Sequence, residues 1–145
     1  MRQASSPPWV VDLGYGASPV TAVELARRMR AVRHDVRLLG LEIDPQRVKD
    51  ANWAQDPPAR QFAVGGFEIP MPHGERPLLV RAFNVLRQYD ESQVRAAWDQ
   101  MVARLAPGGA VVEGTCDEIG RLSTWVHLRA AAPGRPIRLR PRQSR

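Results

Sequence analysis

Apolar residues along this chain fall into two kinds of pattern. Short, nearly continuous apolar runs occur at positions 9–11, 36–43, 61–64, 78–80 and 109–115. Two longer segments, 20–32 and 91–105, instead repeat apolar residues every three or four positions, as amphipathic helices do. Continuous apolar runs are typical of strands that are covered on both faces. The pattern therefore predicts an α/β fold in which a doubly wound, mostly parallel sheet carries helices on both faces.

Polar residues and prolines mark where the helices should begin. Ser18 is expected to cap the first helix, with Pro19 at its first position, where a missing N–H costs nothing. Asp44 is placed to cap a second helix, and the third should begin at Asp90 or Glu91. These start signals alternate with the apolar runs, as repeated strand–helix–strand units require.

The stretch with the clearest chemistry is WVVDLGYGAS, residues 9–18. Gly14 and Gly16 follow the first strand, where the backbone must bend sharply and let a ligand approach closely. The third glycine of the dinucleotide-binding pattern G-x-G-x-x-G is absent, because Pro19 takes its place. Asp12 puts a carboxylate beside the turn, which disfavours a doubly anionic pyrophosphate and favours a ligand with an ammonium and a sulfonium group.

The segment VVDLGYGAS is similar to the first motif of class I S-adenosylmethionine-dependent methyltransferases, in which a strand ends in an acid and G-x-G follows. Ser18 stands where this family usually has a third glycine. The L-x-P-G-G turn before the fifth strand also resembles the family, and the resemblance extends from residue 9 to about residue 115. It implies a Rossmann-like sheet in the order 3-2-1-4-5, S-adenosylmethionine as the cofactor, and transfer of its methyl group to an acceptor that the motifs do not specify.

The resemblance also implies a set of cofactor-binding residues. Glu42, at the end of the second strand, would accept hydrogen bonds from the two ribose hydroxyls. Gly66 and Phe67 would line the adenine ring, and Glu68 is either the acid that contacts its amine or an exposed loop residue. The full set implied is Asp12, Gly14, Tyr15, Gly16, Ser18, Glu42, Ile43, Gly66, Phe67 and Asn84.

Candidates for the acceptor side follow the fourth and fifth strands. Asn84 is the first candidate for positioning the methyl acceptor, and Arg87 and Tyr89 are either behind it or packing residues. One acidic or hydroxyl side chain where the fifth strand opens toward the substrate side is also expected to face an acceptor; the choices are Glu113, Thr115, Asp117 and Glu118. A methyl transfer needs mainly alignment of the acceptor with the methyl carbon, so no catalytic base is assigned.

We expect the closing part of the sheet to be reduced, because the resemblance runs short after about residue 115. Class I methyltransferases close the sheet with a sixth and a seventh strand that are antiparallel to each other; residues 124–128 could form one of these. The Arg-Pro-rich segment that follows does not resemble a strand, so we expect the closing hairpin to be incomplete or absent. The edge left uncovered would allow copies of the chain to form a homo-oligomer.

Composition favours one domain, from residue 9 to residue 129, with an extension at 1–8 and a basic tail at 130–145. There is no signal-peptide pattern and no apolar run of membrane-spanning length, so we expect a cytoplasmic protein without a membrane segment. A single cysteine excludes an internal disulfide, and three scattered histidines leave no zinc-ligand spacing, so no metal site is predicted.

The formal net charge of +6 belongs to the C-terminal end. Residues 121–145 contain seven arginines and no acid, whereas residues 1–120 hold 14 basic and 15 acidic groups. The tail contains prolines and has no apolar periodicity, so we expect it to be disordered. Two interpretations stay open: the tail binds nucleic acid or another polyanion, or it is merely solvated.

Two other classes of function also stay open. A non-catalytic methyltransferase-like module for binding or assembly is favoured by the missing closing strands. An NAD-dependent oxidoreductase is favoured only by the general α/β plan, and Asp12 and Pro19 count against it.

Overall fold

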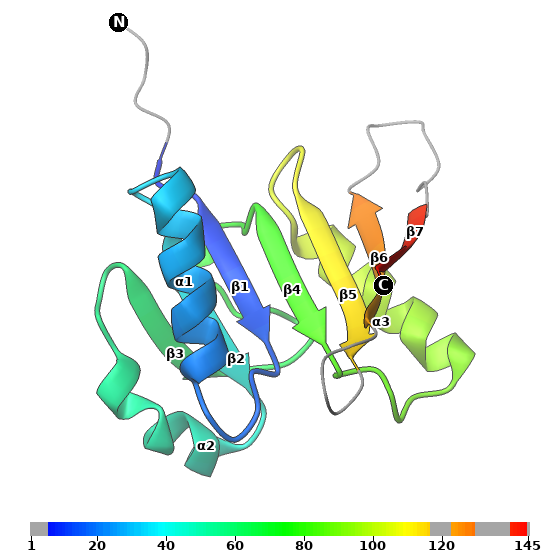
Figure 1. Cartoon of the computed structure of the whole chain (residues 1–145), viewed down its shortest axis with the longest axis horizontal. Helices are drawn as coiled ribbons and strands as arrows, with labels where there is room; N and C mark the ends of the chain where they lie inside the picture. Colours follow the sequence, from blue (N-terminus) through cyan, green and yellow to red (C-terminus); the bar gives the residue numbers. More distant parts are fainter. Residues whose placement is uncertain (1–5, 117–122, 130–139, 145) are drawn as a thin grey trace, which may run out of the picture.

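The computed structural model describes residues 6–116, 123–129 and 140–144. They form one seven-stranded sheet in the order β3-β2-β1-β4-β5-β6-β7, with helices on both faces (Figure 1). The order of the first five strands and the Rossmann-like plan agree with the prediction. Within the described segments, no helix is both long enough and apolar enough to cross a membrane.

The strands are β1 (Trp9–Leu13), β2 (Arg37–Glu42), β3 (Arg60–Val64), β4 (Leu79–Phe83), β5 (Ala110–Cys116), β6 (Ser123–Arg129) and β7 (Arg140–Ser144). The helices are α1 (Val20–Val32), α2 (Pro45–Asp50) and α3 (Glu91–Arg104), with two short 3-10 turns at Asn52–Ala54 and Pro72–Gly74.

Strands β1 to β5 are all parallel, so their carboxyl ends meet at one edge of the sheet. Strand β1 is central: Asp12 lies opposite Gly40 of β2 on one side and opposite Arg81 of β4 on the other. Successive strands are added on one side of β1 up to β3 and then on the other side from β4 onward. Such a reversal leaves a crevice at the carboxyl ends of β1 and β4, where ligands bind in open α/β sheets.

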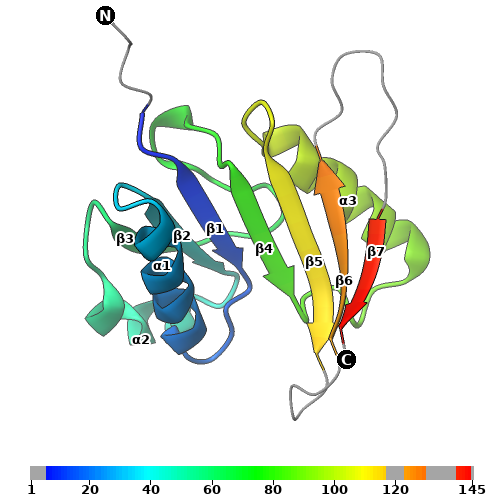
Figure 2. The same ribbon diagram turned by 45° about the horizontal axis from the view of Figure 1, so that its top comes forward.

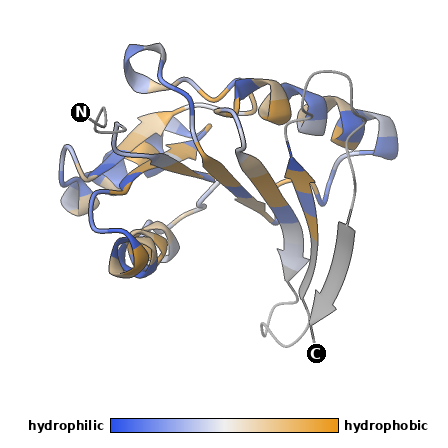
Figure 3. Ribbon diagram, turned by 90° about the horizontal axis from the view of Figure 1, so that it is seen from above, coloured by the Kyte–Doolittle hydropathy of each residue, from blue (hydrophilic) through white to orange (hydrophobic). Residues whose placement is uncertain are grey.

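Each face of the sheet has its own hydrophobic core. Helix α3 covers one face, where its Ala97 and Met101 are buried against strand residues such as Val11 and Val80. Helix α1 covers the opposite face through Ala22 and Ala26. Figure 2 shows α3 behind β5 and β6, and Figure 3 shows α1 and α3 on opposite sides of largely hydrophobic central strands.

The expected absence of a closing hairpin is wrong. Strand β6 pairs antiparallel with β5, and β7 pairs antiparallel with β6, with Val126 opposite Pro141. An edge strand needs hydrogen bonds to only one neighbour, so it tolerates a proline and requires no apolar pattern of its own. Part of the tail, residues 140–144, is therefore a strand and not disordered; residues 130–139 and 145 lie outside the described residues.

Helix boundaries agree with the predicted capping signals in two of three cases. Asp44 accepts a hydrogen bond from the backbone N–H of Gln46 (2.8 Å), and Asp90 caps α3 in a reciprocal capping box with Gln93. Helix α1 begins one residue later than predicted, with Pro19 at the N-cap position and no side-chain cap.

Candidate functional site

A cavity of about 900 Å³ lies at the carboxyl ends of β1, β2 and β4, where the order of the strands reverses. It is large enough for a small-molecule cofactor together with a second small ligand. The lining residues come from the ends of β1, β2 and β4, the loops after β1, β2, β3 and β4, and the helices α1 and α2: Asp12, Leu13, Gly14, Tyr15, Gly16, Thr21, Glu42, Ile43, Arg47, Gly65, Gly66, Phe67, Glu68, Arg81, Phe83, Asn84, Val85, Gln88 and Tyr89.

The glycine turn forms the floor of this cavity because it is held close to both neighbouring strands. Gly14 (φ 67°) and Gly16 (φ 85°) both have left-handed backbones, which favour glycine. The N–H of Gly14 donates to the carbonyl of Leu41 at 2.7 Å. A Cβ at Gly14 would lie 2.7 Å from Cγ2 of Val85, so this position has no room for a side chain.

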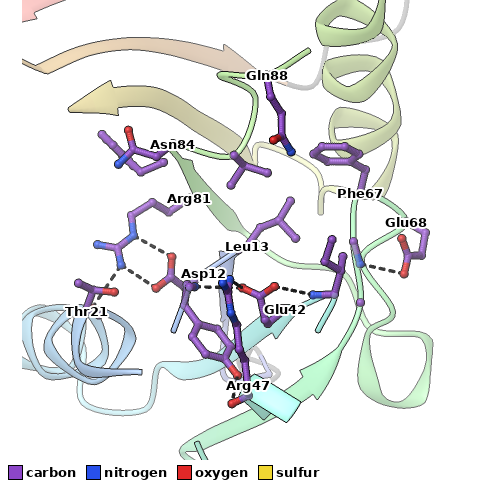
Figure 4. A pocket seen from close by; sticks show the side chains of 18 of the residues that line it. Asp12, Leu13, Thr21, Glu42, Arg47, Phe67, Glu68, Arg81, Asn84 and Gln88 are labelled. Carbon is purple, nitrogen blue, oxygen red and sulfur yellow. Dashed lines mark hydrogen bonds and ion pairs between the residues drawn. The ribbon is translucent and has the colours of Figure 1, made fainter. Parts of the chain in front are cut away.

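Glu42 joins the end of β2 to the glycine turn. Its side chain is buried, and Oε2 accepts a hydrogen bond from the Gly16 N–H at 3.0 Å. The other oxygen, Oε1, accepts from the N–H groups of Ile43 (3.0 Å) and Asp44 (3.3 Å), while Arg47 approaches Oε2 at 3.7 Å. Figure 4 shows this carboxylate on the wall of the cavity beside Leu13. Glu42 is thus a fixed acceptor at the point where β1 and β2 both end.

Tyr15 belongs to the core beneath the cavity. Its ring packs edge-on against Phe62 at a centroid distance of 5.2 Å, and its hydroxyl lies 3.4 Å from the carbonyl oxygen of Arg47. Burial, with the nearby carboxylates of Glu42 and Asp50, raises the pKa of Tyr15 to about 12. Tyr15 therefore stays protonated at neutral pH and supports the turn from below.

Asp12 is not the uncompensated charge that the sequence suggests. The carboxylate is buried and forms two parallel bonds with Arg81: Nε to Oδ1 at 3.0 Å and Nη2 to Oδ2 at 2.6 Å (Figure 4). Burial raises the pKa of Asp12, and the guanidinium opposes that rise. Because the pair is neutral overall, Asp12 gives no net repulsion of a phosphate, and that reason for excluding a dinucleotide does not hold.

An aromatic pair forms another wall. The rings of Phe67, from the loop after β3, and Tyr89, which precedes α3, meet edge to face with centroids 5.9 Å apart. The Glu68 carboxylate accepts a hydrogen bond from the N–H of Gly66 at 2.9 Å and so stabilises the loop after β3. This pair brings together two loops that are far apart in the sequence.

Asn84 lies at the end of β4 and lines the cavity, as predicted. Its backbone is left-handed (φ 59°), a conformation that asparagine adopts more readily than most residues. Its N–H donates to the carbonyl of Gly114 at 2.8 Å, which anchors the turn where the chain leaves the sheet.

Nine of the ten predicted cofactor residues line the cavity; Ser18 does not. Ser18 is exposed, and its hydroxyl lies 3.4 Å from the N–H of Val20. On the acceptor side, Tyr89 reaches the cavity, but Arg87 is exposed outside it.

Glu113 and Thr115 also lie outside the cavity lining. Glu113 is buried, and its burial raises the pKa of its carboxyl. Glu113 lies two residues after Val111, which is in the core with α3, so both side chains are on the α3 face of the sheet. The remaining two candidates, Asp117 and Glu118, lie outside the described residues.

Arg81 is the main site residue that the sequence analysis misses. It interrupts the apolar run LLVRAF, just as Asp12 interrupts the run of β1. In the predicted strand order, β1 and β4 are neighbours. An acid and a base at matching positions in these two strands could therefore have identified the pair. Over the residues that the structure covers, no three His, Cys, Asp or Glu side chains are grouped to hold a metal ion.

Comparison with known proteins shows the fold. No protein-family model and no curated protein sequence matches this chain. Among solved structures, LepI in complex with SAM is similar with a TM-score of 0.60 and 15% identity over 83% of this chain and 30% of that chain. Human N-acetylserotonin methyltransferase in complex with SAM gives 0.56, 22% identity, and coverage of 82% and 33%. The CcbJ methyltransferase from Streptomyces caelestis gives 0.55, 19% identity, and coverage of 97% and 66%.

These similarities establish a class I methyltransferase fold. The chain spans about 30% of the length of LepI and 33% of that of the human enzyme.

Proposed function

From this shared fold we propose that the chain binds S-adenosylmethionine in the cavity at the carboxyl ends of β1, β2 and β4 and transfers its methyl group to a small acceptor. The observation that carries this proposal is Glu42, a buried carboxylate fixed beside the glycine turn. In this position it can accept hydrogen bonds from the ribose hydroxyls of an adenosyl ligand.

The rest of the cavity supplies the other contacts that such a ligand needs. Gly66 and Phe67 offer a backbone edge and a ring for the adenine, next to Ile43, which is 71% exposed and so has apolar surface available for a ligand. Gly14 and Gly16 let the ligand approach the backbone of the turn.

Asn84 is our candidate for positioning the acceptor. It is exposed at the end of β4, across the cavity from the adenine side. The sulfonium is an intrinsically good leaving group, so holding the acceptor in line with the methyl carbon supplies most of the rate enhancement. An amide that donates or accepts one hydrogen bond is sufficient for such alignment.

The non-catalytic alternative loses the observation that favoured it, because β6 and β7 are present. The dinucleotide alternative has to be tested directly, because the Asp12–Arg81 pair is neutral overall. Isothermal titration calorimetry with S-adenosylmethionine, S-adenosylhomocysteine and NAD separates these functions. We expect the first two ligands to bind; binding of NAD alone would overturn the proposal.

Glu42 provides the sharper test. Glu42→Ala should weaken S-adenosylhomocysteine binding by about 1–3 kcal/mol, because hydrogen bonds from the ribose are lost. Glu42→Gln keeps one acceptor oxygen, so its affinity for S-adenosylhomocysteine should fall less. Glu24→Ala changes the exposed face of α1 and should leave this affinity unchanged. Circular dichroism must show that all three variants are folded; equal affinity in Glu42→Ala and wild type would remove Glu42 from the site.

A further inference from the structure

Strand β3 is one of the two edges of the sheet, and β7 is the other (Figure 1). An edge strand presents the backbone N–H and C=O of every second residue to the outside, where a strand of another molecule can pair with them. Just before and just after β3, the Ala59 carbonyl and the Gly65 N–H are bonded to β2, at 2.9 and 3.1 Å. The outward backbone groups of β3 therefore belong to the alternate residues Arg60, Phe62 and Val64.

Two of these three residues are already paired by the segment that precedes β3. Asp56 forms an antiparallel bridge with Arg60, with N to O distances of 2.8 and 2.9 Å, and Arg60 Nε donates to the carbonyl of Ala54 at 2.6 Å. The Gln55 amide NH2 donates to the Phe62 carbonyl, and the amide oxygen accepts from the Phe62 N–H, both at 3.1 Å. One side-chain amide thus makes the two hydrogen bonds that the backbone of a neighbouring strand would make.

The rest of this edge carries exposed apolar surface. Val64 is 50% exposed, and its backbone N–H and C=O have no partner among the residues that the structure describes. Trp53, two residues before Gln55, is 66% exposed. An open strand edge with apolar side chains beside it favours pairing between copies of a chain. Gln55 therefore occupies the position on which such pairing depends.

A second copy would fit the open edge in one register. If Phe62 and Val64 were both free, two antiparallel β3 strands could pair about a two-fold axis at Ala63. Phe62 of each copy would then lie opposite Val64 of the other, and roughly four backbone hydrogen bonds would form. With Gln55 in place, Phe62 is already paired and this register is closed.

We propose that the Gln55 side chain closes the β3 edge against pairing with a second copy of this chain, and that its removal makes β3 a symmetric dimer interface. The inference is independent of cofactor binding, because none of the residues 60–64 lines the cavity.

Disulfide trapping tests this register. In the proposed pairing the two Ala63 Cα atoms face each other across the two-fold axis at about 4.5 Å, within the range that a disulfide spans. Ala63→Cys is placed in a Cys116→Ala background, because the chain has a single cysteine. Under an oxidant we expect this variant to stay monomeric on a non-reducing gel while Gln55 is present, and to form a disulfide-linked dimer when Gln55→Ala is added.

Hydrogen exchange and sedimentation measure the two parts of the proposal separately. In dilute Gln55→Ala the Phe62 N–H should exchange about tenfold faster, because its acceptor is lost. At high protein concentration, sedimentation should show a larger fraction of dimer than in wild type. The matched control is Gln46→Ala, which removes a glutamine of α2 that bonds to the Asp50 side chain at 2.9 Å, and it should behave as wild type.

Gln55→Ser guards against an effect of the added alanine, because its polar side chain is too short to reach Phe62 and should also allow the dimer to form. Circular dichroism must show that the variants are folded. Equal cross-linking of Ala63→Cys with and without Gln55 would overturn the proposal. So would folded Gln55→Ala and Gln55→Ser proteins that expose the Phe62 N–H to exchange but neither associate nor cross-link.

Discussion

At the scale of single residues, two carboxylates with similar burial have different partners. Glu42 is held by backbone N–H groups from two loops, whereas Asp12 is held by one guanidinium. A substitution at Glu42 therefore changes the contacts of the glycine turn as well as the acceptor offered to a ligand, and a substitution at Arg81 leaves the charge of Asp12 unpaired.

Removing Arg81 should destabilise the protein more at high pH than at low pH. Burial raises the pKa of Asp12, and without the guanidinium this pKa rises further. A carboxyl with a raised pKa in the folded state stabilises the fold when protonated, and that contribution is lost as pH rises through the folded pKa. We expect Arg81→Gln to cost about 3 kcal/mol at neutral pH and less as the pH is lowered.

Urea unfolding of Arg81→Gln and wild type at roughly pH 4.5 and pH 8 measures this difference. The double variant with Asp12→Asn should recover most of the lost stability at pH 8, because no buried charge is left unpaired. An identical cost of Arg81→Gln at both pH values would show that Asp12 does not titrate in this range.

At the scale of elements, α3 depends on its first turn. Asp90 accepts from the N–H of Gln93 at 2.9 Å, and the Gln93 side chain accepts from the N–H of Asp90 at 3.1 Å. Asp90→Ala removes the first of these bonds and should lower the free energy of unfolding by about 1 kcal/mol.

The matched control for this helix is Asp90→Asn, which keeps an oxygen at the cap and should lose only a few tenths of a kcal/mol, by roughly the usual ranking of caps. Thermal unfolding followed by circular dichroism distinguishes the two variants. If Asp90→Ala unfolds at the wild-type temperature, the capping box contributes nothing to the stability of α3.

The elements that could be predicted from sequence are those whose own residues carry the signal. Strands β1 and β2 are apolar because both faces are covered, and α3 has a cap and a periodic apolar face. Strand β7 has no apolar pattern of its own, because it is held by backbone pairing with β6 at the edge of the sheet. Strand β7 forms because β6 is beside it, and the sequence of residues 140–144 alone does not indicate this pairing.

The parts of the site that could be predicted from sequence are likewise those that a local motif specifies. Glu42 and the glycine turn follow from a motif within one unit of the chain, and both lie in the cavity. The pairing of Asp12 with Arg81 joins residues 69 positions apart, and it follows only once β1 and β4 are known to be neighbours. Periodicity alone does not ensure burial: Val32 continues the apolar pattern of α1 but lies at the last position of the helix and is 88% exposed.

At the scale of the whole molecule, ligand binding should be visible as stability. The cavity is built from β1, β2, β4 and the loops between them, so a bound ligand links parts that separate on unfolding. At a concentration of roughly one hundred times its Kd, a ligand specific for the folded state adds about 2.7 kcal/mol. For a chain of this size we expect a rise in Tm of roughly 8 °C with S-adenosylhomocysteine.

Differential scanning fluorimetry over a range of ligand concentrations measures this shift. The Tm should rise with the logarithm of the ligand concentration above the Kd, and the Glu42→Ala curve should be displaced to higher concentrations. Adenosine serves as a control that shares the base and the ribose, and it should give a smaller shift at the same concentration. A Tm that does not change with S-adenosylhomocysteine would contradict specific binding to the folded state.

The direction of the last strand decides where the end of β7 lies. Both β5 and β7 run antiparallel to β6, so Ser144 lies beside Ser123 and level with Cys116 at the end of β5. This is the edge that carries the cavity, and Figure 1 shows the start of β1 at the opposite edge. Three strand spacings, about 14 Å, separate β7 from β4. A fluorescent dye attached after Ser144 would lie at the same edge of the sheet as an occupied pocket, whereas a dye or an affinity tag placed before Trp9 would lie at the opposite edge.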